Sequence, residues 1–224
     1  RVVLATVSRC RFLQGLATGG LVLAVGFGSR ARAQEPKKCG ADGMPNGWVD
    51  DPLVFVSIAD DGTVTIVCHR SEMGQGIRTG MPMIVADEME ADWKRVRVAQ
   101  ATGDEKKFGN QDTDGSRSTR HFFEPMRRCG AAARVMLEAA AAERWKVPVS
   151  EVAAKNHEVV HRASGRRLGY GALAKAAAGQ PVPQRASLRL KDPKDFRYIG
   201  KGQLKLVDAA DIASGKAKYG IDTR

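Results

Sequence analysis

The sequence predicts an α+β fold in which helices pack on one face of a mixed β-sheet. Two short β-branched runs flank an Asp-Gly turn near residue 60, a pattern typical of a β-hairpin. A third alternating run at 95–98 follows a segment with helical periodicity, and a long helical pattern covers residues 118–145. With 224 residues, 43% of them hydrophobic, the chain can build one or two domains with a sizeable core.

The predicted hairpin joins strands at 53–59 and 63–68. Its turn, residues 60–62, contains an Asp-Gly pair, which tolerates the positive φ that a tight turn requires. The two strands should therefore pair antiparallel and bring the chain to Gln75. Residues 95–98 alternate between charged and apolar side chains and predict a third strand.

Two helices are predicted after the hairpin. In the first, apolar residues recur mostly at spacings of three and four: Ile77, Met81, Ile84, Val85 and Met89. Pro82 is expected in the first turn, where its missing N–H does no harm. Acidic residues at 87, 88 and 90 crowd the end that the helix dipole disfavours, and solvent exposure is the one explanation the sequence offers. In the second helix, at 118–145, Pro125 is expected to break the pattern near its start.

The rest of the chain alternates between loops and short elements. Residues 102–115 predict a polar loop with Phe108 as its one apolar anchor, and such a loop is ordered by what it binds or is not ordered at all. Residues 147–152 predict a loop with a short turn. A second hairpin is predicted at 158–162 and 167–169 around a Gly-containing turn, followed by a short helix at 170–178.

The first 33 residues predict an export signal, because Arg9 and Arg11 precede an apolar segment and Ala31-Arg32-Ala33 forms a cleavage site. The segment resembles the twin-arginine pattern, with Cys10 in the place of the second arginine. An uncleaved amphipathic tail is the alternative interpretation. After this segment we expect a linker at 34–51, a folded domain at 52–180, a Pro- and Lys-containing linker at 181–204 and the start of another domain at 205–224.

Composition excludes some functions. The net charge of +11 falls to +6 once residues 1–33 are set aside, because these residues hold five arginines and no acidic residue. A charge of this size does not indicate nucleic-acid binding. The four cysteines form no Cys-x-x-Cys pair, which argues against zinc or iron–sulfur ligation within this chain. We expect Cys68 and Cys129 to be small buried side chains. Whether Cys39 is free or paired stays open.

Two glycine- and serine-flanked helix starts are the candidate site. In the first, Gly74 and Gly76 flank Gln75, so the backbone can come close to a ligand, and the free N–H groups of the following helix suit an anion. The second start, at 114–120, is rich in small hydroxyl residues. Each alone could be an ordinary strand–turn–helix corner. Together they could face one ligand that carries phosphate and a polar ring system.

These two stretches carry a family resemblance. Residues 71–79 (Ser-Glu-Met-Gly-Gln-Gly-Ile-Arg-Thr) and 115–119 (Gly-Ser-Arg-Ser-Thr) resemble the molybdopterin-binding large subunits of the xanthine dehydrogenase and aldehyde oxidase family, with isoquinoline 1-oxidoreductase as the closest branch. The sequence around 121–134 and 215–222 is similar as well. The resemblance implies half of a molybdopterin-binding lobe, the start of an α/β "hammerhead" domain at 205–224 and an N-terminal fragment of a larger enzyme.

The resemblance also implies a chemistry and its components. Members of this family oxidise an aldehyde or a nitrogen heterocycle with oxygen from water, using molybdenum on molybdopterin cytosine dinucleotide. Electrons pass to a small [2Fe-2S] subunit, with a cytochrome c subunit as a further partner. The export signal adds a periplasmic location, or the periplasmic face of the inner membrane. The catalytic glutamate lies far toward the family's C-terminus, so the resemblance assigns no catalytic residue to this sequence.

The resemblance assigns cofactor contacts residue by residue. Gln75 would contact the pterin or its phosphate, the 115–119 segment would line the pterin and its dinucleotide tail, and Arg117 is either a phosphate ligand or a surface charge. We expect Glu72 to fix its loop by accepting N–H bonds, and His69 to support the cofactor loop. The predicted cofactor-binding residues are Gly74, Gln75, Gly76, Gly115, Ser116, Arg117, Ser118 and Thr119.

Two other functions remain open from the sequence. A non-catalytic module that binds an anion or nucleotide would share the same glycine and serine loops. A decayed gene is suggested by Cys10. No protein ligands to a metal are predicted, because in this family a dithiolene group of the pterin holds molybdenum.

Overall fold

The structure, a computed structural model, describes residues 40–223. The predicted export signal, Cys10 and Cys39 lie outside these residues. The central sheet has three strands in the order β1-β2-β3. β1 pairs antiparallel with β2, with Val56 opposite Ile66, whereas β3 pairs parallel with β2. The sheet is therefore mixed, and the predicted antiparallel hairpin is confirmed. The strands are β1 (Val56–Ile58), β2 (Val64–Cys68) and β3 (Val96–Gln100).

The predicted first strand begins too early. Residues Pro52–Phe55 form a helical turn, α2, before the chain extends. The carboxylate of Asp51 accepts the backbone N–H of Leu53 at 2.9 Å, and Pro52 occupies the first helical position. An Asp-Pro pair is a helix start, and here it outweighs the apolar pattern that follows it.

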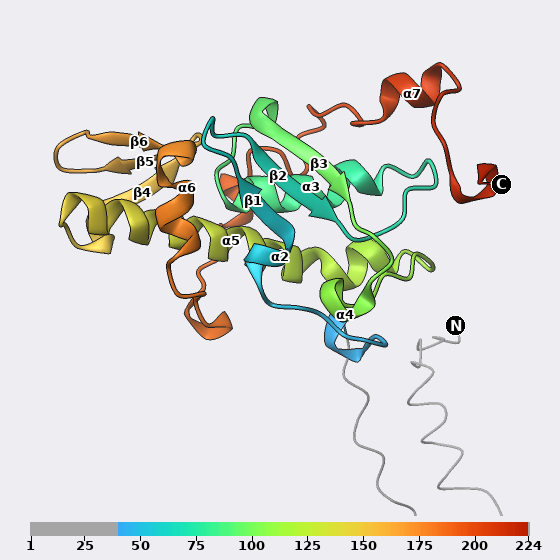
Figure 1. Ribbon diagram of the computed structural model, residues 1–224, viewed down its shortest axis with the longest axis horizontal. Coiled ribbons are helices and arrows are strands. Elements are labelled where there is room, and N and C mark those ends of the chain that lie inside the picture. Colours follow the sequence, from blue (N-terminus) through green and yellow to red (C-terminus); the bar gives the residue numbers. More distant parts are fainter. Residues whose placement is uncertain (1–39, 224) are drawn as a thin grey trace, which may run out of the picture. The chain divides into compact units, whose positions relative to one another are not determined.

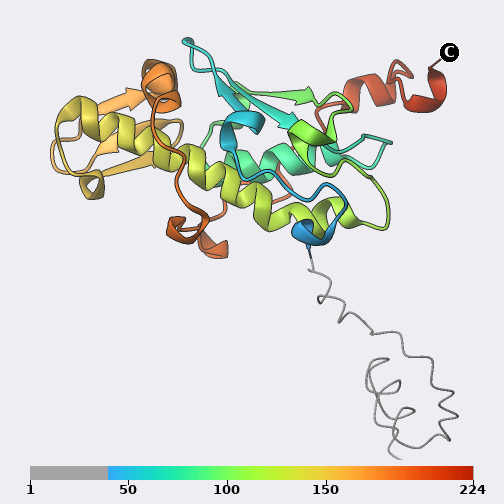
Figure 2. The same cartoon turned by 60° about the horizontal axis from the view of Figure 1, so that its bottom comes forward.

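Two helices pack together on one face of this sheet: α3 (Ile77–Glu88) and α5 (Arg117–Trp145). Figure 2 shows them running side by side beneath the three strands. Gly130 of α5 lies where the helices touch. A Cβ atom there would come within 2.5 Å of the carbonyl oxygen of Val85, so the absence of a side chain lets the two helices approach closely. The predicted α+β class, with helices on one face, is confirmed as well.

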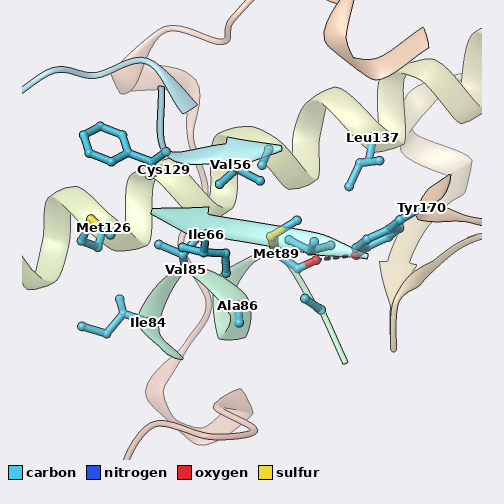
Figure 3. Close-up of a cluster of buried hydrophobic side chains, with 14 of the residues drawn as sticks. Val56, Ile66, Ile84, Val85, Ala86, Met89, Met126, Cys129, Leu137 and Tyr170 are labelled. Carbon is cyan, nitrogen blue, oxygen red and sulfur yellow. Dashed lines mark hydrogen bonds between the residues drawn. The ribbon is translucent and has the colours of Figure 1, made fainter. Parts of the chain in front are cut away.

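The core lies between the sheet and these helices (Figure 3). Alternate residues of β2 are completely buried, as the two-residue period of a strand requires when one face packs on helices. The hydroxyl group of Tyr170 donates a hydrogen bond to the backbone oxygen of Met89 in the same core. Cys68 and Cys129 are free, buried thiols, as expected. Burial raises the pKa of Cys68 to about 11 and raises that of Cys129 further.

Both proline predictions were wrong. Pro82 is the sixth residue of α3 and lies inside the helix, not in its first turn. Pro125 lies inside α5, which continues without a break to Trp145. Each proline is fully or almost fully buried against neighbouring elements. A helix loses one backbone hydrogen bond at a proline, but the packing of the proline against neighbouring elements can compensate for this loss and keep the segment helical.

A second three-stranded sheet, in the order β4-β5-β6, follows α5. The predicted hairpin is its second half. Strand β4 was not predicted, although Asn156, which favours a left-handed turn, marks the reversal after it with φ of 50°. Helix α6 follows and has the predicted bounds. These elements are β4 (Val152–Lys155), β5 (Glu158–His161), β6 (Arg167–Gly169) and α6 (Tyr170–Ala178), and they lie at one end of the molecule in Figure 1.

The acidic end of α3 is not solvent-exposed. The side chains of Asp87 and Glu88 are completely buried. Asp87 accepts the backbone N–H groups of Arg197, Tyr198 and Ile199 and pairs with the ammonium group of Lys191 at 2.9 Å. These carboxylates therefore attach the segment 191–199 to the helix pair. Their hydrogen bonds and ion pairs outweigh the unfavourable interaction with the α3 helix dipole.

Glu88 completes this attachment from the side of α5. It pairs with the guanidinium groups of Arg127 at 2.6 Å and Arg134 at 3.5 Å. The remaining helices are short: α4 (Glu105–Phe108), α7 (Ala209–Ala213) and the 3-10 turns Ala41–Gly43, Trp93–Arg95, Val149–Glu151, Arg185–Ser187, Pro193–Asp195 and Gly220–Asp222. Across residues 40–223, the helices are too short or too polar to cross a membrane. The domain boundaries stay a prediction.

Candidate cofactor site between two helix starts

The two predicted site stretches meet at one hollow. Helices α3 and α5 both begin at the right-hand side of the molecule in Figure 1. A cavity of about 300 Å³ opens between their starts. Its lining residues come from both stretches: Met73, Gln75, Ile77, Thr113, Asp114, Gly115, Ser116, Ser118 and Thr119. The structure therefore brings Gln75 and Ser116 to one hollow.

The two stretches are also tied together directly. The backbone N–H of Ser71 donates to the hydroxyl oxygen of Thr113 at 3.0 Å. The Nε of Arg70 donates to the hydroxyl oxygen of Ser118 at 3.0 Å. These bonds cross from the first helix start to the second, so the walls of the hollow are held by the protein itself.

The first loop is built around Glu72. Its carboxylate accepts the N–H groups of Gly74 and Gly76, each at 2.8 Å, and of Arg78 at 2.9 Å. The expected role of Glu72 is thereby confirmed. The same bonds restrict another expectation, because the carboxylate already occupies two N–H groups at the start of α3, those of Gly76 and Arg78.

Gln75 lines the hollow while its amide holds its own loop. The side-chain oxygen accepts the N–H of Met73, and the side-chain nitrogen donates to the carbonyl oxygen of Ser71 at 2.8 Å. An amide nitrogen carries two N–H groups, so one remains for a ligand. Gly74 and Gly76, which flank it, have φ of 97° and 81° and are not among the lining residues. A Cβ atom at Gly76 would meet Leu206 at 2.7 Å, so its close neighbour is the chain's own segment.

The second loop enters α5 through a strained turn. Gly115 and Ser116 both have left-handed backbone, with φ of 47° and 57°. This conformation costs a serine about 1 kcal/mol or more, and such strain concentrates at functional sites. It places Ser116, Ser118 and Thr119 along the hollow, where their hydroxyl groups can donate hydrogen bonds without bulk.

Arg117 is not among the residues that line the hollow. Its guanidinium group pairs with the carboxylate of Asp114 and contacts the sulfur of Met44 at 3.7 Å. The hydrogen bond with Asp114 raises the pKa of Arg117. Of the eight predicted binding residues, Gly74, Gly76 and Arg117 are therefore outside the lining, and the roles of all eight stay predictions.

The polar loop 102–115 is ordered by protein contacts, which corrects the expectation that a ligand would order it. It contains helix α4, whose first turn is capped by Asp104. The side chain of Gln111 donates to the carbonyl oxygen of Thr102 at 2.9 Å and accepts the N–H of Asp104 at 2.7 Å. Asn110 accepts two hydrogen bonds from Arg70. No sequence pattern indicated this role for Arg70, because an arginine next to a loop is usually exposed.

His69 lies beneath the loop in an aromatic cluster. Its ring is 5.1 Å from that of Phe122 and 5.5 Å from those of Trp48 and Phe55. Among residues 40–223, neither ring nitrogen has a hydrogen-bond partner. Burial, with a smaller contribution from the neighbouring Arg70 charge, lowers the pKa of His69 to about 3. The imidazole is therefore neutral and packs as an apolar group.

The sequence profile of the molybdopterin cofactor-binding domain matches residues 14–203. The chain belongs to this family. Its relatives include the beta chain of isoquinoline 1-oxidoreductase from Brevundimonas diminuta, 33% identical over 97% of this chain and 32% of that protein. They also include a membrane-bound aldehyde dehydrogenase (pyrroloquinoline-quinone) of Gluconacetobacter polyoxogenes, 35% identical over 81% of this chain and 23% of that protein. The molybdopterin-binding chain thus spans about a third or less of the length of these curated relatives.

A more distant relative is one subunit of nicotinate dehydrogenase from Pseudomonas putida, 28% identical over 76% of this chain and 14% of that protein. Among solved structures, quinoline 2-oxidoreductase from Pseudomonas putida 86 matches with a TM-score of 0.46 and 17% identity, over 55% of this chain and 16% of that one. A likeness of this level adds nothing to the assignment, which the family match carries.

The donor set of the hollow fits a molybdopterin cofactor. The hydroxyl groups and the spare amide N–H that line it are suited to phosphate oxygens and to the edge of a pterin, and the buried guanidinium group of Arg70 lies behind Ser118. Within residues 40–223, no three His, Cys, Asp or Glu side chains come together as metal ligands would. In the molybdopterin-binding domain the residues that line the hollow would therefore hold the organic part of the cofactor.

Proposed function

We propose that this chain forms one wall of the cofactor site in the large subunit of a molybdenum hydroxylase. The observation that carries the proposal is the hollow shared by Gln75 and Ser116, in a chain that belongs to the molybdopterin-binding family. The cofactor we propose is molybdopterin cytosine dinucleotide. When bound, it would supply a two-electron redox centre at which oxygen from water is transferred to the substrate.

The chain's own residues bind and orient the cofactor. Ser116, Ser118 and Thr119 donate hydroxyl hydrogen bonds to its anionic oxygens, and Gln75 offers its second amide N–H. Asp114 is the one carboxylate among the lining residues, and it is paired with Arg117. Because Arg117 already engages this carboxylate, we assign proton transfer to residues outside this chain.

We propose that the substrate is an aldehyde or a nitrogen heterocycle and that electrons leave through a small [2Fe-2S] subunit, with a cytochrome c subunit as a further partner. The relatives named for isoquinoline, aldehyde and nicotinate support the substrate class, and two of them are named as subunits. We further propose a periplasmic location, on the basis of the signal pattern in residues 1–33.

Cofactor content tests the proposal. The complete protein that contains this chain would be purified from its host, and molybdenum and CMP would be measured after acid release. We expect both, in equal amounts. A Thr119→Trp variant places an indole at the hollow and should lose both, whereas Ser150→Trp, at an exposed position in a distant turn, should keep them. Absence of molybdenum and CMP from the wild-type protein would refute the proposal and leave a non-catalytic binding module.

A further inference from the structure

Arg70 is a buried cation next to the hollow. It lies two residues after the end of strand β2, and its side chain is completely buried. Its Nη1 donates to the backbone oxygen of Asn110 at 2.6 Å and to the side-chain oxygen of Asn110 at 2.8 Å. Its Nε donates to Ser118, which lines the hollow. The guanidinium carbon lies 4.5 Å above the ring of Phe122.

Within residues 40–223, the hydrogen-bond partners of Arg70 are all neutral, and its Nη2 has none. Burial lowers the pKa of its guanidinium group, but an arginine keeps its proton in proteins. The carboxylate of Asp112 accepts a hydrogen bond from Asn110 at 3.1 Å, so it is linked to Arg70 only through Asn110 and does not bond the guanidinium group directly. A buried charge without a direct counter-ion is costly, and an anion in the adjoining hollow would offset that cost.

Arg70 also decides what Ser118 can do. The Nε–H of Arg70 uses an acceptor site on the Ser118 oxygen, so the hydroxyl hydrogen is directed elsewhere. In the part of the chain that the structure describes, the Ser118 hydroxyl donates to no protein acceptor, although the residue lines the hollow. Its hydrogen is thus free for a ligand oxygen.

We propose that Arg70 is a positioning residue that makes the hollow selective for an anionic group, by holding Ser118 as a hydrogen-bond donor and by supplying an unpaired positive charge behind it. The ligand class is an oxyanion such as the phosphate of the pterin nucleotide. This inference rests on the proposed function, because it takes the cofactor to occupy the hollow. It assigns no step of the reaction to Arg70.

Cofactor retention in the complete enzyme tests the inference. Wild-type, Ser118→Ala, Arg70→Met and the double variant would be incubated at one temperature, and the release of molybdenum and CMP followed over time. Each single variant should release both about tenfold faster, as expected for loss of one charge-assisted hydrogen bond. The double variant should be no faster than Arg70→Met, because Arg70 acts through Ser118. Arg120→Gln, which removes an exposed charge two residues from Ser118 and outside the lining, should release at the wild-type rate.

The outcomes separate this inference from the proposed function. If the wild-type enzyme holds no molybdenum or CMP, both fail. If it holds them and Arg70→Met or Ser118→Ala releases them at the wild-type rate, the inference alone is wrong. Additive single effects, or equal acceleration in Arg120→Gln, would also overturn it. If Arg70→Met does not fold, Ser118→Ala and Arg70→Lys provide the test. Arg70→Lys keeps the charge but not the planar donor, so it should release molybdenum and CMP faster than the wild type. Release at the wild-type rate in either variant would overturn the inference.

Discussion

Asp87 should control whether the segment 197–199 stays attached to α3, and Asp87→Asn is the perturbation that tests this. The substitution keeps the size of the side chain and removes its charge. The carboxylate accepts three consecutive backbone N–H groups and pairs with Lys191. Burial by itself raises the pKa of Asp87, but hydrogen bonds from Ile199, Tyr198, Lys191 and Arg197 outweigh it and hold the pKa below its ordinary value.

The magnitude follows from the number of donors left without an acceptor. An asparagine amide presents one oxygen and two N–H groups where four donors converge, so at least two donors lose their partner. Each orphaned buried donor costs about 1–3 kcal/mol, and removing one member of a buried ion pair costs about 3–5 kcal/mol. Lys191 keeps a bond to Glu90 at 2.6 Å, which favours the lower end. We expect about 3 kcal/mol, or roughly a hundredfold in the local opening equilibrium.

Hydrogen–deuterium exchange of the complete protein, read by mass spectrometry, measures this opening. Peptides that cover 193–200 should exchange roughly a hundredfold faster in Asp87→Asn, while peptides from α5 keep wild-type protection. Asp195→Asn makes the same chemical change at an exposed position in the same segment and should have no effect. Unchanged protection of 197–199 would refute the attachment, and equal loss of protection in α5 would show global unfolding instead of local opening.

Three further predictions concern the core and its titration. Gly130→Ala should lower the free energy of unfolding by about 1–3 kcal/mol, because the new Cβ atom would collide with the backbone of Val85. Gly80→Ala has open space around the new Cβ atom and should raise the free energy of unfolding by up to about 1 kcal/mol. Chemical denaturation measures both changes. His69 stays neutral in the fold down to about pH 3, whereas the unfolded chain protonates it near pH 6.5, so stability should fall as pH drops through this window. His69→Phe should flatten that slope, and an unchanged slope would contradict the assignment. Cys68 and Cys129 should react with a thiol reagent only upon unfolding, and peptide mapping that finds either of them rapidly labelled in the native protein would contradict this.

Local chemistry was visible in the sequence wherever one short pattern dominates. The Asp-Gly turn predicted the β1–β2 hairpin, the periodicity predicted both long helices, and the bounds of α6 were predicted as observed. The role of Glu72 followed from its place before two glycines. The paired motifs also indicated the family that the profile match shows.

The structure decided what depends on partners distant in the chain. Pro82 and Pro125 stay helical because packing on the rest of the fold outweighs one missing hydrogen bond each. Asp87 is buried because donors from 104 to 112 residues later converge on it. Arg70 reaches Ser118 across 48 residues. No local pattern encodes such contacts, since the free energy that buries a charge comes from groups that only tertiary folding brings within hydrogen-bond distance.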